Sequence, residues 1–221
     1  MGAHRNRLIP FRFRLTQRDS AGDLSNTAHK INPMSSPVET PDWSKIPAPQ
    51  DEGGARHLPG MQMASVSLPA TDGRVIDLSA QPGRVVIYAY PRTGVPDVPN
   101  PAGWDAIPGA RGCTPQSCAF RDHFQELKSL GVRAVFGLST PDSAYQREAA
   151  ERLRLPFPLL SDEKLLLTHA MNLPTFRVGQ MTLLNRFTLI VTDGRIEHVF
   201  YPVFPPDRNA GDVMAWLTEH R

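Results

Sequence analysis

The sequence predicts an α/β fold: a mixed central β-sheet with helices on both faces and a β-hairpin at its N-terminal end. The continuous apolar run at 84–90, with its β-branched and aromatic residues, and the segment at 132–138 predict buried strands, and each is followed by a segment of helical periodicity. A pair of strands joined by a turn at residues 193–194 and then a last helix complete the chain. Strand–helix–strand units followed by a hairpin and a helix are typical of mixed sheets covered on both faces.

This domain is expected to occupy residues 58–221, after an N-terminal extension over residues 1–57. The extension has scattered apolar residues, many prolines after residue 33, and six Lys/Arg against two Asp/Glu in residues 1–33. Such a composition predicts a disordered, basic and Pro-rich segment. Met34 is an alternative start of the native protein, which would remove the basic part.

Charge and hydropathy narrow the classes of partner. After residue 33 the chain carries 18 basic and 20 acidic residues, so the domain is not expected to bind nucleic acid through a basic surface. No apolar run reaches the roughly 18 residues of a membrane-spanning helix. We therefore expect a cytoplasmic protein with neither a membrane nor a nucleic acid as its partner.

The N-terminal hairpin is predicted from alternating residues at 66–68 and 75–78 around the Asp72-Gly73 turn. The central strand at 84–90 ends at Pro91. Residues 92–112 then form a loop with four prolines, and loops of this length in a compact domain are usually functional or mobile.

A helix is expected from about residue 115 to residue 130. Thr114 is a plausible N-cap, and Pro115 suits the first helical position because it lacks the N–H that would be unpaired there. Gly131 ends the pattern, whose apolar face consists of Phe120, Phe124 and Leu127.

The rest of the chain is predicted from weaker signals of the same kinds. In order, we expect a strand at 132–138, a helix starting at Thr140-Pro141, a short strand at 157–160, a helix capped by Ser161 and ending at Met171, a loop at 174–185, strands at 186–191 and 196–201, and a helix from about Asn209.

Both cysteines of the protein lie at the start of the helix at 115–130. Unpaired N–H groups and the helix dipole favour the thiolate, the nucleophilic form, at Cys113, whereas Cys118 lies about one turn inside and is expected to be less acidic. Five helical positions rise about 7.5 Å, which exceeds the roughly 7 Å limit between the Cα atoms of a disulfide. A bridge between the two would therefore require the first turns of the helix to unwind.

The stretch 112–122, GCTPQSCAFRD, after a strand that ends in Tyr90-Pro91, resembles the peroxiredoxins, which are thiol peroxidases of the thioredoxin fold. It is most similar to the bacterioferritin-comigratory-protein or Q group. The segments LPFPLLSD at 155–162 and RFTLI at 186–190 match the same group, and the resemblance covers about residues 58–221.

The resemblance implies a thioredoxin-like fold and a thiol-dependent peroxidase that reduces hydrogen peroxide or organic hydroperoxides. It implies that Cys113 is the peroxidatic cysteine, that Cys118 resolves its sulfenic acid as an intramolecular disulfide, and that Arg186 stabilises the thiolate and the transition state. A thioredoxin-like dithiol protein would recycle the disulfide. We expect no cofactor, no metal, and a monomer or weak dimer.

The approach to Cys113 departs from the family pattern. Pro91 precedes Cys113 by 22 positions instead of seven, an insertion of 15 residues, and Ala110 stands where the pattern has a threonine. Thr93, the only threonine in this segment, and Arg111 are therefore candidates for the missing polar group. The insertion is expected to form a lid or rim, with Trp104 as its apolar anchor.

Two alternatives on the same fold stay open. A thiol–disulfide oxidoreductase without peroxidase activity would normally use Cys-x-x-Cys, and four residues separate the cysteines here. A redox-sensing protein is favoured by the missing threonine and opposed by the intact cysteines and Arg186. Three residues of the cysteine helix, Gln116, Arg121 and Asp122, are expected on its surface.

Overall fold

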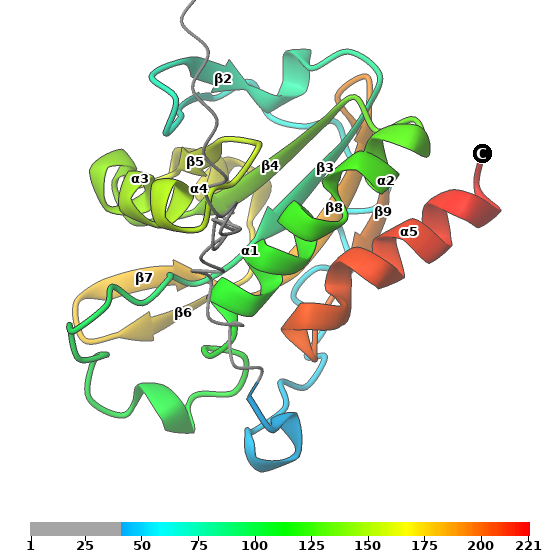
Figure 1. Ribbon diagram of the computed structural model, residues 1–221. Coiled ribbons are helices and arrows are strands. Elements are labelled where there is room, and N and C mark those ends of the chain that lie inside the picture. The colour runs from blue at the N-terminus through cyan, green and yellow to red at the C-terminus, as the bar shows by residue number, and fades with distance from the viewer. Residues whose placement is uncertain (1–40) are drawn as a thin grey trace, which may run out of the picture. The chain divides into compact units, whose positions relative to one another are not determined.

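The centre of the fold is a five-stranded mixed sheet with the strand order β5-β4-β3-β8-β9 (Figure 1). The computed structural model describes residues 41–221, and residues 1–40 of the predicted extension lie outside the described residues. Strand β3 pairs in parallel with β4 and antiparallel with β8. The five strands are β3 (Arg84–Ala89), β4 (Ala134–Ser139), β5 (Leu159–Ser161), β8 (Phe187–Thr192) and β9 (Arg195–Phe200). The predicted mixed sheet and its central strand are confirmed.

Side chains of the central strand alternate between the two faces of the sheet, and helices cover both faces. On β3, Val86 and Tyr88 face one apolar cluster, and Val85 and Ile87 face the other. The first cluster is completed by α1 (Cys113–Asp122), α2 (Phe124–Ser129), α3 (Ser143–Arg152) and α5 (Asn209–Glu219), and the second by α4 (Leu166–Met171). Helices on both faces are thus confirmed (Figure 1).

The predicted N-terminal hairpin is present as β1 (Ser67–Pro69) and β2 (Val75–Asp77), which pair antiparallel. It forms a two-stranded sheet of its own, and one bridge from Ala70 to Leu160 links it to β5. Its buried side chains Leu68 and Ile76 belong to the same cluster as α4.

The predicted start and length of the cysteine helix are wrong. Gly112, not Thr114, is the N-cap, so Cys113 is the first residue of α1. The helix expected to reach residue 130 is divided in two at His123, whose backbone leaves helical geometry (φ −94°, ψ 11°). Pro115 still lies in the first turn, where its missing N–H costs no hydrogen bond.

Aspartate carboxylates, not the predicted hydroxyl residues, accept from backbone N–H groups in the first turns of two further helices. The carboxylate of Asp142, not Thr140, caps α3 by accepting from the Tyr145 N–H at 2.7 Å. Ser161 belongs to β5, and Asp162 accepts from the backbone N–H groups of Leu167 and Thr168. A carboxylate at such a position also interacts favourably with the helix dipole.

The predicted loop at residues 174–185 is a hairpin of β6 (Thr175–Val178) and β7 (Met181–Leu184). Only Gly179 and Gln180 connect the strands, and Gly179 takes the positive φ (55°) that a tight hairpin turn needs. The strands are short and only partly buried, which hides their alternation in the sequence.

Residues 41–57 have a defined course, although the sequence places them in a disordered extension. They include a short 3₁₀ helix, η1 (Trp43–Lys45), and Ala55 is buried in the core. The Trp43 indole donates a 2.9 Å hydrogen bond to Asp207 and packs on Phe204. These partners lie about 160 positions away along the chain, so local composition cannot reveal them.

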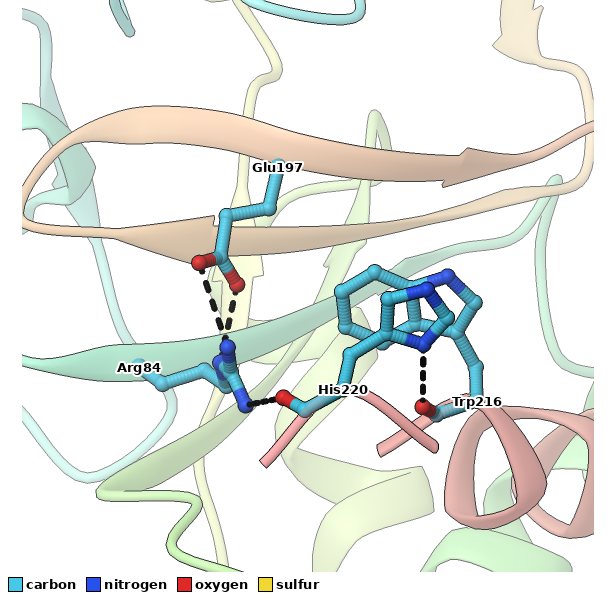
Figure 2. A network of polar contacts seen from close by, with 4 residues as sticks. All are labelled: Arg84, Glu197, Trp216 and His220. Carbon is cyan, nitrogen blue, oxygen red and sulfur yellow. Dashed lines mark hydrogen bonds and ion pairs between the residues drawn. The ribbon is translucent and has the colours of Figure 1, made fainter. Parts of the chain in front are cut away.

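The end of α5 is held against the edge of the sheet by a polar and aromatic network (Figure 2). Arg84 forms an ion pair with Glu197 at 2.8 Å and donates to the His220 carbonyl. The Trp216 ring stacks with the imidazoles of His220 and His198, whose centroids are 4.1 and 5.0 Å away.

Protonation of His198 is expected to destabilise this network. Burial and then the neighbouring His220 lower the pKa of His198 below its ordinary value of 6.5. The folded state therefore binds this proton less readily than the unfolded state, and stability is lost as the pH falls from about 6.5 through the folded-state pKa. His198→Phe should reduce the slope of the free energy of unfolding against pH between about pH 5 and 7. An unchanged slope would assign the pH dependence to other groups.

Candidate active site

Cys113 owes its position at the mouth of α1 to Gly112. This residue has φ +99°, and a Cβ built on it would lie 2.6 Å from Pro206 Cγ and 2.8 Å from Trp43 Cη2. The backbone can turn into the helix here only because no side chain is present. As a result Cys113 becomes the first helical residue, with its side chain almost completely buried beside the loop 109–112.

Gly112→Ala should therefore destabilise the protein more than a positive φ alone explains. The unfavourable conformation costs about 1 to 2 kcal/mol, and the clash with Pro206 and Trp43 adds to it. Gly131→Ala is the matched control, because Gly131 has φ +90° but a Cβ added there would meet no atom within 4 Å. Urea unfolding of both variants measures the difference, and equal losses would mean that the packing on Gly112 is unimportant.

Arg186 places its guanidinium directly beside the Cys113 sulfur. The residue is only 2% exposed, and Nη2 lies 3.2 Å from Cys113 Sγ. The same nitrogen donates to the carbonyl oxygens of Gly109 and Arg111, and Nη1 donates to Gln116 Oε1. The sequence-predicted cation and nucleophile are thus in contact, although they are 73 positions apart.

The prediction that Gln116 lies on the helix surface is wrong: the residue is fully buried, with 0% exposure. It lies one turn after Cys113 on the same face of α1, which packs against α5. Its Nε2 donates to Asn209 Oδ1 at 2.9 Å. Spacing from Cys113 offered a signal for Gln116, whereas no local pattern pointed to Asn209.

A pocket of about 230 Å³ opens on Cys113. Its lining includes Arg92 and Arg111 and no carboxylate, although the Arg111 guanidinium is paired with Asp105 outside the lining. The sequence did not predict Arg92, which packs over the Tyr145 ring at 5.0 Å and donates to its hydroxyl. The polar and apolar residues that line the pocket beside the cysteine include Arg92, Asn100, Trp104, Arg111 and Thr114.

The two substitute candidates for the missing threonine occupy different places. Thr93 is buried, and its hydroxyl oxygen has no hydrogen-bond partner among residues 41–221, while its carbonyl accepts from the Tyr145 hydroxyl. The Arg111 guanidinium forms a 3.5 Å ion pair with the exposed Asp105. Arg111 reaches the described site through its carbonyl, which accepts from Arg186.

The insertion is anchored over the β6–β7 hairpin, so it forms one wall of the site. Trp104 is buried in a small cluster with Ala110, Val178 and Leu183, and its ring lies 6.4 Å from that of Phe176. The predicted role of Trp104 as an apolar anchor is confirmed. The hairpin that supports it is the segment for which the sequence predicts a loop.

Cys118 is buried in the same helix, and both cysteines are free thiols. Burial raises the pKa of the Cys118 thiol, and the nearby Arg121 opposes this only in part. Around it the helix is firmly packed: Phe120 stacks on Tyr88 at 4.5 Å, and the Tyr88 hydroxyl donates to Ser117. With both residues helical, the pair cannot bridge without local unwinding.

Arg121 and Asp122 lie toward the surface, as expected, and pair with each other at 2.8 Å. Arg121 also donates to the Leu153 carbonyl, which ties the end of α1 to the end of α3. Among residues 41–221, no three His, Cys, Asp or Glu side chains group as metal ligands, and no helix is long and apolar enough to cross a membrane.

A buried cysteine–arginine pair at a helix N-terminus, on a mixed sheet covered by helices, defines a thioredoxin-like α/β protein with a thiol site. The family model described as Redoxin matches residues 58–214, and the chain belongs to this family, with relatives of the peroxiredoxin Q and Bcp type. The peroxiredoxin Bcp of Escherichia coli K12 is 33% identical over 159 residues, which cover 70% of this chain and 91% of that protein.

Two further similarities support the assignment to this family. The chloroplastic peroxiredoxin Q of Oryza sativa subsp. japonica is 32% identical over 160 residues, covering 72% of this chain but 65% of the rice protein, so the match spans just under two thirds of that relative. The crystal structure of peroxidoxin BcpB from Mycobacterium tuberculosis superposes with a TM-score of 0.60 at 26% identity, over 74% of this chain and 97% of that one.

Proposed function

We propose that this protein is a thiol-dependent peroxidase that reduces hydrogen peroxide or organic hydroperoxides. The observation that carries the proposal is the 3.2 Å contact between Arg186 Nη2 and Cys113 Sγ, because Cys113 also lines a pocket of about 230 Å³ that gives a substrate access to it. A cation and a helix N-terminus beside a sulfur stabilise the negative charge that develops there in the reaction with a peroxide. The similarity to relatives named peroxiredoxin Q and peroxiredoxin Bcp supports the same reaction.

In the first step the Cys113 thiolate attacks one peroxide oxygen. An S–O bond forms, the O–O bond breaks, and the leaving oxygen takes a proton to become water or an alcohol, so sulfur is oxidised to sulfenic acid. Negative charge spreads over sulfur and both oxygens in the transition state. Arg186 and the N-terminal N–H groups of α1 are fixed donors for that charge, and fixed donors need no reorganisation.

In the second step the Cys118 sulfur attacks the sulfenic acid of Cys113. An S–S bond forms, the S–O bond breaks, and water leaves with the thiol proton. Because both cysteines lie in α1, its first turns have to unwind for the sulfurs to meet. Unwinding also frees Cys118 from the surroundings that raise its pKa.

In the third step an external dithiol reduces the disulfide by exchange, which restores two thiols and leaves the reductant as a disulfide. A thioredoxin-like protein is our candidate. A cytoplasmic location and a monomer or weak dimer remain predictions. Thr93 and Arg111 remain candidates for secondary support, Thr93 through its hydroxyl, which has no partner among residues 41–221.

A peroxide-consumption assay with thioredoxin, its reductase and NADPH tests the proposal, with hydrogen peroxide and an organic hydroperoxide compared at equal concentration. Consumption of either substrate that needs all components is the expected result. Loss of thioredoxin-dependent turnover for every peroxide, combined with exchange against a disulfide substrate, would favour a thiol–disulfide oxidoreductase on the same fold.

A further inference from the structure

Buried polar side chains connect the start of α5 to Arg186. Asn209, the first residue of α5, is 1% exposed, and its Oδ1 accepts from Gln116 Nε2 at 2.9 Å and from Thr188 Oγ1 at 2.6 Å. Gln116 in turn accepts from Arg186 Nη1 through its Oε1. The chain of hydrogen bonds therefore runs from α5 through α1 to the cation beside Cys113.

The direction of these bonds depends on Asn209. Its oxygen accepts two donors, so the Gln116 amide turns its NH₂ toward Asn209 and its oxygen toward Arg186. The opposite orientation would place an NH₂ group against a guanidinium, two donors without an acceptor. In a buried network each hydrogen bond that is lost leaves an unpaired polar group, which raises the free-energy cost of losing that bond.

We propose that Asn209 is a positioning residue that acts through Gln116: it holds the Arg186 guanidinium at the Cys113 sulfur and stabilises the helical form of residues 113–118 against the unwound form. The inference rests on the proposed function. It adds to that function a residue from α5 that sets the balance between reaction with peroxide and disulfide formation.

The position of Gln116 explains why the same residue affects both the placement of Arg186 and the stability of the helical form. Gln116 lies between the two cysteines, so unwinding that brings Cys113 to Cys118 also displaces Gln116 and breaks its bonds to Arg186 and Asn209. Asn209 stays behind, because α5 is fixed in the core by Val213 and Leu217. The anchor is thus independent of the segment that moves.

Two rate constants test the inference. Asn209→Ala should slow the oxidation of Cys113 by hydrogen peroxide about tenfold, measured as sulfenic acid trapping in a Cys118→Ser background, because Arg186 is held less firmly. The same substitution with both cysteines present should speed disulfide formation. Thr188→Val removes only one donor to Asn209, so it should produce a smaller change in the same two directions.

Val213→Ala is the structural control, because Val213 is buried on the same helix and belongs to the apolar cluster. It should lower stability but leave the ratio of the two rate constants at the wild-type value. If Asn209→Ala and Val213→Ala change the ratio equally, or if Asn209→Ala slows both steps, Asn209 is only a packing residue and the inference is wrong.

A double-mutant cycle with Gln116→Ala separates action through Gln116 from direct action. The rate constant for Cys113 oxidation should fall no further in the double variant than in Gln116→Ala alone, whereas additive reductions would contradict the inference.

Alkylation of Cys113 by iodoacetamide in the Cys118→Ser background measures the reactivity of the sulfur without peroxide. A wild-type protein inert to peroxide would refute the proposed function, and an alkylation rate unchanged by Asn209→Ala would refute the role of Asn209.

Discussion

Cys113→Ser should reduce peroxide consumption to the uncatalysed background, a loss of at least about a thousandfold. The substitution keeps the size of the side chain and its place at the first position of α1, so the fold should be retained. What disappears is the thiolate: a serine hydroxyl stays protonated near neutral pH, and its oxygen cannot form the sulfenic acid on which the cycle depends. The measurement is the second-order rate constant for hydrogen peroxide.

Arg186→Lys is an informative companion to this variant. Lysine keeps the charge but loses the planar fork that contacts Cys113, Gln116 and two carbonyl oxygens together. Its rate constant should fall between those of the wild type and Cys113→Ser. Normal consumption by Cys113→Ser would contradict the assignment of the nucleophile.

Cys118→Ser should abolish turnover with thioredoxin while preserving a single reaction with peroxide. The site around Cys113 is untouched, so the sulfenic acid forms at the wild-type rate. Without the second thiol it has no partner within the chain, because the sequence contains only two cysteines. The sulfenic acid then persists or is oxidised further to sulfinic acid.

The expected readout is one equivalent of peroxide consumed per chain, or two where the sulfenic acid is oxidised further to sulfinic acid, followed by arrest. Ser117→Ala is the matched control, since Ser117 is the neighbouring residue of α1, is also buried, and loses only its bond to the Tyr88 hydroxyl. This control should keep multiple turnovers. Sustained turnover by Cys118→Ser would show that an external thiol resolves the sulfenic acid.

Strong local patterns made much of the fold predictable. The run 84–90 is apolar after its first residue because it forms the centre of the sheet, and the Asp72-Gly73 turn determines the first hairpin. Hairpin β6–β7 is not predicted from the sequence, because its strands are only four residues each and partly exposed. The ordered course of residues 41–57 is not predicted either, because it depends on distant contacts such as that of Trp43 with Asp207.

The sequence predicts only those site residues that have a reactive side chain or belong to a recognisable motif. Two cysteines near a helix start and a matching motif were enough to single out Cys113, Cys118 and Arg186. Spacing from Cys113 offered a signal for Gln116, but the sequence could not reveal that Asn209 reaches it from α5 or that Arg92 lines the pocket. These facts depend on how α1, α5 and the insertion pack, and no spacing within one element determines such packing.

The proposed cycle depends above all on one event: peroxide converts Cys113 and Cys118 into a disulfide by unwinding the start of α1. Hydrogen–deuterium exchange of the wild-type protein, before and after one equivalent of hydrogen peroxide, detects that unwinding. We expect a disulfide between residues 113 and 118 by mass spectrometry, together with faster backbone exchange over residues 113–120. A disulfide formed with unchanged exchange in this segment, or two thiols that stay free after treatment with peroxide, would refute the cycle.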